Sequence, residues 1–387
     1  MLKLLAVHGY RSLRDVVVPL DGLTVITGPN GTGKSNLYRA FGLLAAAANG
    51  DLIHSLAAAG GLDSVLWAGP EVISGAMRRG EAAVQGTSTR REPVALKLGF
   101  ATDELSYLID VGLPTPGGPP LFARDPEIKR EAIWSGPLLR PASLLLERRR
   151  ADVRQRGEKG WHALDWALGP RTSVLDELAD PLTFPEAAAV RRQVRQWRFH
   201  DQFRTDDHSP ARSPQVATWT DAVSGDGSDL APAAGSVLSS AWAEPFRAAV
   251  DDAFPGSTVE LLDAAGRLQI ALTQPGMLRP LAGTELSDGT VRYLMLATAL
   301  FAPRPPSLLV LNEPETSLHP DLIAPLARLI SAAAARSQVV VVTHCQPLVE
   351  ALTEQGALHH ELAKSLGQTI VTDQGLLSRP TWDWGKR

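Results

Sequence analysis

The chain has 387 residues, 44% of them hydrophobic, and a formal net charge of −4. These values indicate a globular protein of two or three ordinary domains and argue against one that coats nucleic acid with its whole surface. The single cysteine, Cys345, excludes an intramolecular disulfide framework. Because no stretch resembles a signal peptide or a membrane span, we expect a cytoplasmic protein without a membrane anchor.

The first part of the chain predicts a strand, a glycine-rich loop and a helix in direct succession. Expected strands at 2–8 and 16–20 lead to the apolar run 23–26. Residues 28–35 then fit the P-loop pattern G-x-x-x-x-G-K-[ST], and good helix formers follow at 37–48. Backbone N–H groups of such a loop surround a phosphate, the lysine reaches the β and γ phosphates, and the hydroxyl binds Mg²⁺. The predicted nucleotide-binding residues are Asn30, Gly31, Thr32, Gly33, Lys34, Ser35 and Asn36, with Ser35 also a metal ligand.

An antiparallel β layer is expected in the next part. The region that follows the P-loop helix, to about residue 92, has no regular pattern. Residues 94–100 and 105–111 alternate as a hairpin does, a Pro/Gly loop occupies 114–120, and shorter strands are expected at 128–134 and 144–147.

Residues 173–203 change to helical character. Val190, Val194 and Trp197 form one apolar stripe, which predicts a helix with these side chains turned inward. The arginines beside the stripe form a candidate nucleic-acid contact, and a second candidate lies in an expected turn region. These arginines are Arg191, Arg195 and Arg198 in the first group, and Arg148, Arg149, Arg150, Arg154 and Arg156 in the second. The alternative stays open that they form a solvated face, paired with acidic residues such as Asp176, Glu177 and Asp180, since the chain has 31 arginines against 7 lysines.

Four short motifs follow a loop at 205–235, a helix at 239–254 and a hairpin of 259–262 with 268–273. The sequence Leu-Ser-Asp-Gly-Thr at 286–290 precedes an apolar helix, so Ser287 and the helix N-terminus offer donors to an anion. A buried strand ends in Asn-Glu-Pro-Glu at 312–315, the form of a Walker B segment, with Glu313 placed to orient or deprotonate a water. Ser-Leu-His-Pro follows at 317–320, and a second apolar strand at 338–343 ends at His344.

In this order the motifs resemble the ABC-type ATPase head. About 250 residues separate the P-loop from the 286–290 motif. In this long separation the chain resembles the RecF, SMC and OLD-like branch of predicted AAA-family ATPases. The resemblance implies an α/β P-loop NTPase fold, with an ABC ATPase head, an antiparallel β layer and an inserted helical subdomain. We expect the head to comprise 1–170 and 255–387, and the helical insertion to comprise 171–254. We expect no Toprim nuclease of the OLD type, because the residues given after His344 are too few for such a domain.

The resemblance also implies roles for individual residues. Two heads would form a homodimer around two ATP molecules, with Ser287 and Gly289 of one chain facing the P-loop of the other. Glu313 would be the catalytic base, residues 317–320 the dimer-contacting D-loop, and His344 the sensor of the γ phosphate. The Q-loop glutamine of the family is not assigned, with Gln85 and Gln155 as candidates.

One position departs from the family pattern. Asn312 stands where an aspartate is usual before the catalytic glutamate, which keeps an oxygen for Mg²⁺ or its water but removes a charge. We expect weaker magnesium binding and slow ATP hydrolysis, and a switch that binds ATP without hydrolysing it is the alternative. Two functions remain open: an ATPase that couples its nucleotide state to DNA in repair or anti-phage defence, and a regulatory scaffold that recruits a separately encoded effector.

Overall fold

The structure is a computed structural model of the chain, in which residues 1–71, 73–79, 81, 93–114, 120–201, 203–375 and 378–386 are described. The chain divides into two compact units. The first unit comprises Met1–Asp21, Thr27–Trp197 and His360–Arg387, and the second comprises Gly22–Ile26 and Arg198–His359. Each unit is described by itself.

An eight-stranded antiparallel sheet forms the first unit, with strand order β2-β1-β4-β5-β6-β7-β8-β9. Its strands are β1 (Leu2–Tyr10), β2 (Leu13–Pro19), β4 (Leu96–Thr102), β5 (Leu105–Gly112), β6 (Glu127–Ser135), β7 (Leu144–Arg149), β8 (Asp152–Gly157) and β9 (Gly160–Ala163). The sheet confirms the expected antiparallel layer and its hairpin, while most of the Pro/Gly loop lies outside the described residues. The arginines of the second candidate patch lie mainly on β7 and β8 rather than in a turn region.

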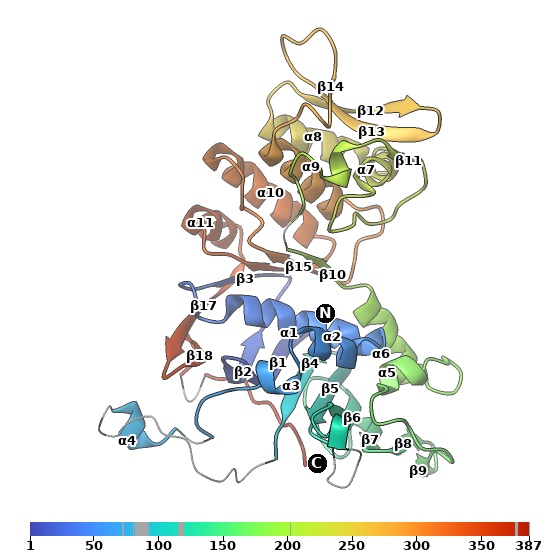
Figure 1. Cartoon of the computed structure of the whole chain (residues 1–387), viewed down its shortest axis with the longest axis vertical. Helices are drawn as coiled ribbons and strands as arrows, with labels where there is room; N and C mark the ends of the chain where they lie inside the picture. Colours follow the sequence, from blue (N-terminus) through green and yellow to red (C-terminus); the bar gives the residue numbers. More distant parts are fainter. Residues whose placement is uncertain are drawn as a thin grey trace. The chain divides into compact units, whose positions relative to one another are not determined.

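Two helices from distant parts of the sequence cover one face of this sheet. They are α1 (Lys34–Ala48) and α6 (Pro185–Arg195), which contact each other and also contact β4 and β5 respectively (Figure 1). Phe41 of α1 meets Trp197, which follows α6, edge to face with ring centroids 6.2 Å apart. Val190, Val194 and Trp197 are all buried, as the apolar stripe predicts.

The remaining elements of the first unit are short. They are α2 (Leu52–Ala58), α3 (Leu62–Val65), α4 (Gly75–Arg78), the 3-10 helix η1 (Pro120–Phe122), α5 (Val174–Glu177) and the hairpin of β17 (Leu358–Ser365) with β18 (Gln368–Val371). In its described part, the region expected to be irregular before residue 92 therefore contains three helices. Their lengths of seven, four and four residues are too short for a helical period to show in the sequence.

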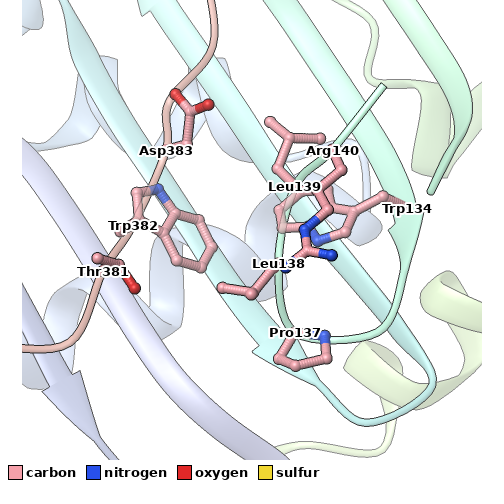
Figure 2. Close-up of a pocket in the computed structure, with 8 residues that line it drawn as sticks. All are labelled: Trp134, Pro137, Leu138, Leu139, Arg140, Thr381, Trp382 and Asp383. Atoms are coloured by element: carbon pink, nitrogen blue, oxygen red, sulfur yellow. The ribbon is translucent and has the colours of Figure 1, made fainter. Parts of the chain in front are cut away.

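The C-terminal segment packs on the antiparallel sheet. Trp382 meets Trp134 of β6 with ring centroids 5.7 Å apart, and a Cβ at Gly99 would lie 2.5 Å from the Trp382 ring, so only glycine fits there. Figure 2 shows Trp382 and Thr381 facing Leu138 and neighbouring residues of the β6–β7 connection across a cavity of about 260 Å³. The segment thereby adds aromatic surface to the small apolar cluster around Trp134.

The second unit contains four parallel strands in the order β10-β15-β16-β3. Their bounds are β10 (Arg198–His200), β15 (Leu308–Asn312), β16 (Gln338–Val342) and β3 (Leu23–Thr27). The strands β15 and β16 are almost entirely buried, as expected of a parallel sheet covered by helices. Because parallel strands end at a common edge, the residues that follow β10, β15 and β16 come together.

Helices and a small antiparallel sheet complete the second unit (Figure 1). The helices are α7 (Leu230–Leu238), α8 (Ala243–Ala253), α9 (Asp288–Leu300), α10 (Ile323–Ala334) and α11 (Gln346–Glu354), with 3-10 helices η2 (Pro210–Arg212) and η3 (Pro320–Leu322). The sheet contains β11 (Gln215–Val216), β12 (Thr258–Ala264), β13 (Arg267–Thr273) and β14 (Leu281–Ala282). The predicted hairpin of β12 and β13 is confirmed, whereas the expected loop 205–235 includes β11 and the start of α7.

The predicted helix around 190–203 is wrong at its C-terminal end. Helix α6 ends at Arg195, and Arg198–His200 instead form β10, which pairs with β15. A parallel strand offers a full row of hydrogen bonds, and that pairing outweighs the local helical preference. The expected insertion 171–254 contributes α5 and α6 to the first unit and α7 and α8 to the second. The domain boundaries stay a prediction. Within the described residues, we find no helix with the length and apolar character needed to cross a membrane.

Candidate nucleotide site

The P-loop in the first unit has a backbone that only glycine adopts without strain. Gly28, Gly31 and Gly33 have φ values of 145°, 82° and 110°. A Cβ at Gly28 would lie 2.3 Å from the carbonyl oxygen of Leu362, and one at Gly33 would lie 2.3 Å from Thr369 Oγ1. The glycines are therefore needed both for the turn and for the close approach of the β17–β18 hairpin.

The P-loop leads directly into the first turn of α1. Gly33 is the N-cap residue of α1 and supplies no side-chain cap, so the first turn of the helix presents backbone N–H groups as an anion site does. Lys34 is 6% exposed and donates from Nζ to the carbonyl oxygens of Gly28 and, at 3.2 Å, Pro29. Ser35 and Asn30 are exposed. The predicted phosphate-binding groups thus gather at one helix N-terminus.

A hydrogen-bond network fixes the P-loop from behind. Thr369 Oγ1 donates to the carbonyl oxygen of Thr32 at 2.6 Å and lies 2.8 Å from Ser12 Oγ. Asn36 Nδ2 donates to Ser12 Oγ at 3.0 Å, and Thr32 Oγ1 donates to the carbonyl oxygen of Pro29 at 2.8 Å. Thr32 and Asn36 therefore hold the loop through these contacts. Ser12 and Thr369 could not be recognised as neighbours of the P-loop from the sequence, because they come from opposite ends of the chain.

The strand ends of the second unit bring together the predicted Walker B residues and His344. Asn312 is opposite Val342 in the β15–β16 pair, and Glu313 N donates to the carbonyl oxygen of Val342 at 2.7 Å. His344 Nδ1 lies 3.2 Å from Glu313 Oε1. Glu313 has a φ of 47°, a left-handed conformation that non-glycine residues adopt chiefly where the surroundings impose it, often at functional sites.

Arg292 and Glu315 lie beside this cluster. Arg292 of α9 is 3% exposed and donates to the backbone carbonyl oxygens of Glu313 at 3.1 Å and Asp201 at 3.4 Å. Burial lowers the pKa of Arg292, while the carboxylates of Glu315, Asp201 and Glu313 act to raise it. Glu315 is 9% exposed, and its Oε1 accepts from Thr343 Oγ1. No periodic pattern singles out Arg292, because it lies on a helix that is buried on nearly all sides.

The 286–290 motif and the 317–320 motif line one cavity of the second unit. Ser287 is the N-cap of α9, and its Oγ accepts from Thr290 N at 3.2 Å. Gly289 lies so close to the following motif that a Cβ would be 3.0 Å from the carbonyl oxygen of Ser317. The cavity has a volume of about 610 Å³. Its lining includes Ser287, Gly289, Thr290, Ser317, His319 and Asp321.

The residues proposed for Mg²⁺ carry oxygen atoms, the ligands that this ion prefers. Asn312 Oδ1 is buried and has no hydrogen-bond donor among the described residues, which suits an oxygen that faces a cation or its water. Asn312 Nδ2 donates to Asp201 Oδ1 at 2.8 Å, so a carboxylate lies beside the amide. Ser35, the other residue proposed for the ion, is exposed. These oxygens fit magnesium, which when bound would offset the negative charge of the phosphates.

Comparison with known proteins identifies the family. Residues 23–349 match the family described as "AAA domain, putative AbiEii toxin, Type IV TA system". The chain belongs to this family. The match includes the P-loop, the 286–290 motif, the Walker B segment and His344, and it confirms the resemblance to ABC-type ATPases of the RecF, SMC and OLD-like branch.

Relatives and solved structures agree with this ATPase family. A stretch of 44 residues is 50% identical to the OLD nuclease of Thermus scotoductus, covering 11% of this chain and only 8% of that protein. The SMC head bound to the C-winged helix domain of ScpA is 14% identical with a TM-score of 0.51, over 97% of this chain and 98% of that one. An SMC head with an extended coiled coil, bound to the C-terminal domain of ScpA derived from Pyrococcus furiosus, is 13% identical with a TM-score of 0.50, over 97% and 96%. The chain therefore has the ABC ATPase head fold.

The arginine groups of this ATPase are less available than the sequence suggested. Arg148 is fully buried and pairs with Glu131 at 3.0 Å, and Arg154 binds Glu147, so neither is a free phosphate contact. Arg191 pairs with Asp176 at 3.3 Å, which favours the solvated and paired alternative at that position. Arg195 ends α6 whereas Arg198 begins β10, so the three arginines do not share one helix.

The Q-loop glutamine stays unassigned between Gln85 and Gln155. Gln85 lies outside the described residues. Gln155 is on β8 of the first unit and donates to Glu186 at 3.3 Å. Asp201 was missed as a site residue because the sequence placed it in a helix.

Proposed function

We propose that the protein is an ATP-binding and ATP-hydrolysing ATPase that dimerises on ATP and couples its nucleotide state to DNA binding, in DNA repair or anti-phage defence. One observation carries the ATPase proposal: a carboxylate, Glu313, and an imidazole, His344, 3.2 Å apart at the end of a Walker B strand. Glu313 can orient or take a proton from the attacking water, and a positioned base of this kind contributes roughly 10²- to 10⁴-fold to a rate.

The P-loop and the strand-end cluster are proposed to act on the same nucleotide. The sequence of β3 runs directly into the P-loop, and β3 is the neighbour of β16 in the parallel sheet. Lys34, Ser35 and the first turn of α1 would bind the phosphates, and Asn312 with Ser35 would hold Mg²⁺. His344 would report the γ phosphate to Glu313. Ser287 and Gly289 would complete the site of a second copy, because the cavity that they line with residues 317–322 does not include Asn312 or Glu313 of the same unit.

ATP binding and hydrolysis can be separated by two variants. Lys34→Ala should weaken ATP binding roughly 10- to 100-fold, since it removes charge-assisted hydrogen bonds to the phosphates. Glu313→Gln should keep the affinity and lose turnover, because it changes only the group that acts in the chemical step. Calorimetric ATP titration and phosphate release measure the two effects. Equal ATP affinity of Lys34→Ala and wild type would contradict the assignment of the P-loop.

A second candidate function is a regulatory ATPase that recruits a separately encoded effector and binds no nucleic acid. The pairing of Arg148, Arg154 and Arg191 within the protein favours it, because these guanidinium groups already have anionic partners. In both functions the nucleotide would control a dimer. They differ in what the dimer binds.

DNA binding by the Glu313→Gln protein, with and without ATP, decides between the two functions. The DNA-coupled ATPase should bind duplex or single-stranded DNA more tightly with MgATP, and the affinity should fall with salt as phosphate contacts are screened. An affinity for DNA that is negligible in both nucleotide states would favour the regulatory ATPase. Lys34→Ala is the control, since its DNA binding should not respond to ATP.

A further inference from the structure

Asp201 and Asn312 are held side by side by the pairing of two parallel strands. His200, the last residue of β10, is opposite Leu311 of β15, so the residues that follow each strand are neighbours. Asn312 Nδ2 donates to Asp201 Oδ1 at 2.8 Å. The contact therefore comes from the register of the sheet, between residues 111 positions apart in the sequence.

This contact determines which way the Asn312 amide points. An ionised carboxylate only accepts hydrogen bonds, so the amide turns its nitrogen to Asp201 and its oxygen away from it. Asn312 Oδ1 is then buried, with no donor among the described residues. A buried acceptor of this kind needs a donor or a cation, because leaving it unpaired is unfavourable.

Arg292 fixes the two strand ends relative to each other. Its guanidinium donates to the backbone carbonyl oxygens of both Asp201 and Glu313, which follow the two paired strands. Arg292 itself is only 3% exposed, and its hydrogen bonds to the two carbonyl oxygens are partly buried. Asp201 is thus kept next to Asn312 by backbone pairing and by a buried side chain.

The charges around the pair favour a cation. Three carboxylates, those of Asp201, Glu313 and Glu315, lie around one permanently charged guanidinium, that of Arg292. Glu315 has a side chain that is 8% exposed, and its Oε2 has no hydrogen-bond donor among the residues that the structure describes. An unpaired buried oxygen such as Asn312 Oδ1, with the carboxylate of Asp201 beside its amide, is what a divalent cation or its bound water would satisfy.

We infer that Asp201 supplies the carboxylate charge that position 312 lacks, and that Asp201 and Asn312 together form the acidic part of the magnesium site. The inference rests on the proposed ATPase function. Asp201 is a positioning residue: it orients the Asn312 oxygen toward the ion and places a negative charge behind it. The carboxylate is thus at position 201, after β10, and not at position 312, and the site has one carboxylate and one amide.

The test compares the charge at the two positions. Affinity for a non-hydrolysable ATP analogue is measured by calorimetry while Mg²⁺ is varied. We call the Mg²⁺ concentration that gives half of the magnesium-dependent increase in affinity the half-effect concentration. Asp201→Asn should raise it roughly 10- to 100-fold, because the variant loses a partner that orients a metal ligand. The affinity for the analogue without magnesium should stay unchanged. The exchange variant Asp201→Asn/Asn312→Asp returns one carboxylate and one amide to the pair, so its half-effect concentration should return to near the wild-type value.

Asn312→Asp alone gives a second readout. It places two carboxylates against each other, so the melting temperature should fall in EDTA and recover with Mg²⁺. Asp207→Asn, an exposed acidic residue that follows in the same loop, is the matched control and should behave as wild type.

Several results would overturn the inference. One is an unchanged half-effect concentration in Asp201→Asn, and another is an exchange variant no better than the single variant. If Asp201→Asn fails to fold, the exchange variant decides: a wild-type half-effect concentration supports the inference and a raised one rejects it. If wild-type protein binds no analogue at any Mg²⁺ concentration, the proposed function itself is wrong and the inference falls with it.

Discussion

His344 Nδ1 lies 3.2 Å from Glu313 Oε1, and the pairing of two parallel strands holds the two residues together. Glu313 follows β15 and donates its N–H to Val342 at the end of β16, two residues before His344. The left-handed backbone of Glu313, with a φ of 47°, turns the chain where the strand ends. Such a conformation costs on the order of 1–3 kcal/mol and is maintained by the surrounding structure, here by the strand pairing and Arg292.

Replacing Glu313 tests its role in the chemical step. We expect Glu313→Gln to lower the rate of ATP hydrolysis roughly 10²- to 10⁴-fold, because an amide cannot accept the proton of the attacking water. Nucleotide affinity should stay near wild type. Steady-state phosphate release and ATP titration measure the two quantities. Glu350→Gln, an exposed glutamate on α11, is the control, and full activity of Glu313→Gln would show that the base lies elsewhere.

The sequence predicted the parts of this site that are local. The P-loop and the Asn-Glu-Pro-Glu segment each combine an apolar strand with a short polar motif, so both strand and chemistry can be read from neighbouring residues. The antiparallel hairpin of β4 and β5 was found in the same way, from alternation and a turn.

Residues that depend on pairing between distant segments could not be predicted. Asp201 follows a strand of three residues, whose partner β15 begins more than a hundred residues later. Three residues are too few for a period, and the apolar stripe of α6 extended the predicted helix over them. Thr369 contacts the P-loop from near the other end of the chain. Arg148 appeared to be a surface charge because its partner Glu131 lies on the adjacent strand β6.

Replacing Ser287 tests the proposed dimer. Ser287 caps α9 and lines the cavity shared with residues 317–322, so Ser287→Arg would place a long cation where a second copy should present its nucleotide. We expect the Glu313→Gln protein to sediment as a heavier species with MgATP and the double variant to remain a monomer. Loss of the cap should cost only about 1 kcal/mol, so the fold should survive. Ser239→Arg, an exposed serine of the same unit, should still dimerise. A monomer in every case would reject the dimer.

Because His200 is buried, we expect the protein to lose stability in mild acid. Burial lowers the pKa of His200 to about 4 from the ordinary 6.5, with a smaller contribution from Arg198. Between pH 6.5 and 4 the unfolded chain therefore takes up a proton that the folded protein does not, so the free energy of unfolding falls as the pH falls. The full effect is about 3 kcal/mol, from 1.36 kcal/mol for each pKa unit.

The measurement is urea unfolding at several pH values. His200→Phe keeps an apolar ring against Phe203, with which His200 stacks, and should reduce the pH dependence in this window. His208→Asn changes an exposed histidine and should retain the wild-type dependence. An identical slope in wild type and His200→Phe would show that another group titrates.

Replacing Arg148 should have a large effect on stability rather than on nucleic-acid binding. Its guanidinium donates to Glu131 at 3.0 Å and to the carbonyl oxygen of Gly169 at 2.6 Å, and both charged side chains are 0% exposed. Removing one partner of such a pair leaves a buried charge without compensation, so Arg148→Ala should lower the free energy of unfolding by about 3–5 kcal/mol.

Arg149→Ala is the matched control for Arg148→Ala. Its side chain is the next in the sequence, is 51% exposed and pairs with Glu147, so the loss should be at most about 1 kcal/mol. The double variant Arg148→Met/Glu131→Leu should recover much of the lost stability, because no buried charge is then left alone. Equal losses for Arg148→Ala and Arg149→Ala in urea unfolding would mean that the buried pair does not stabilise the antiparallel sheet.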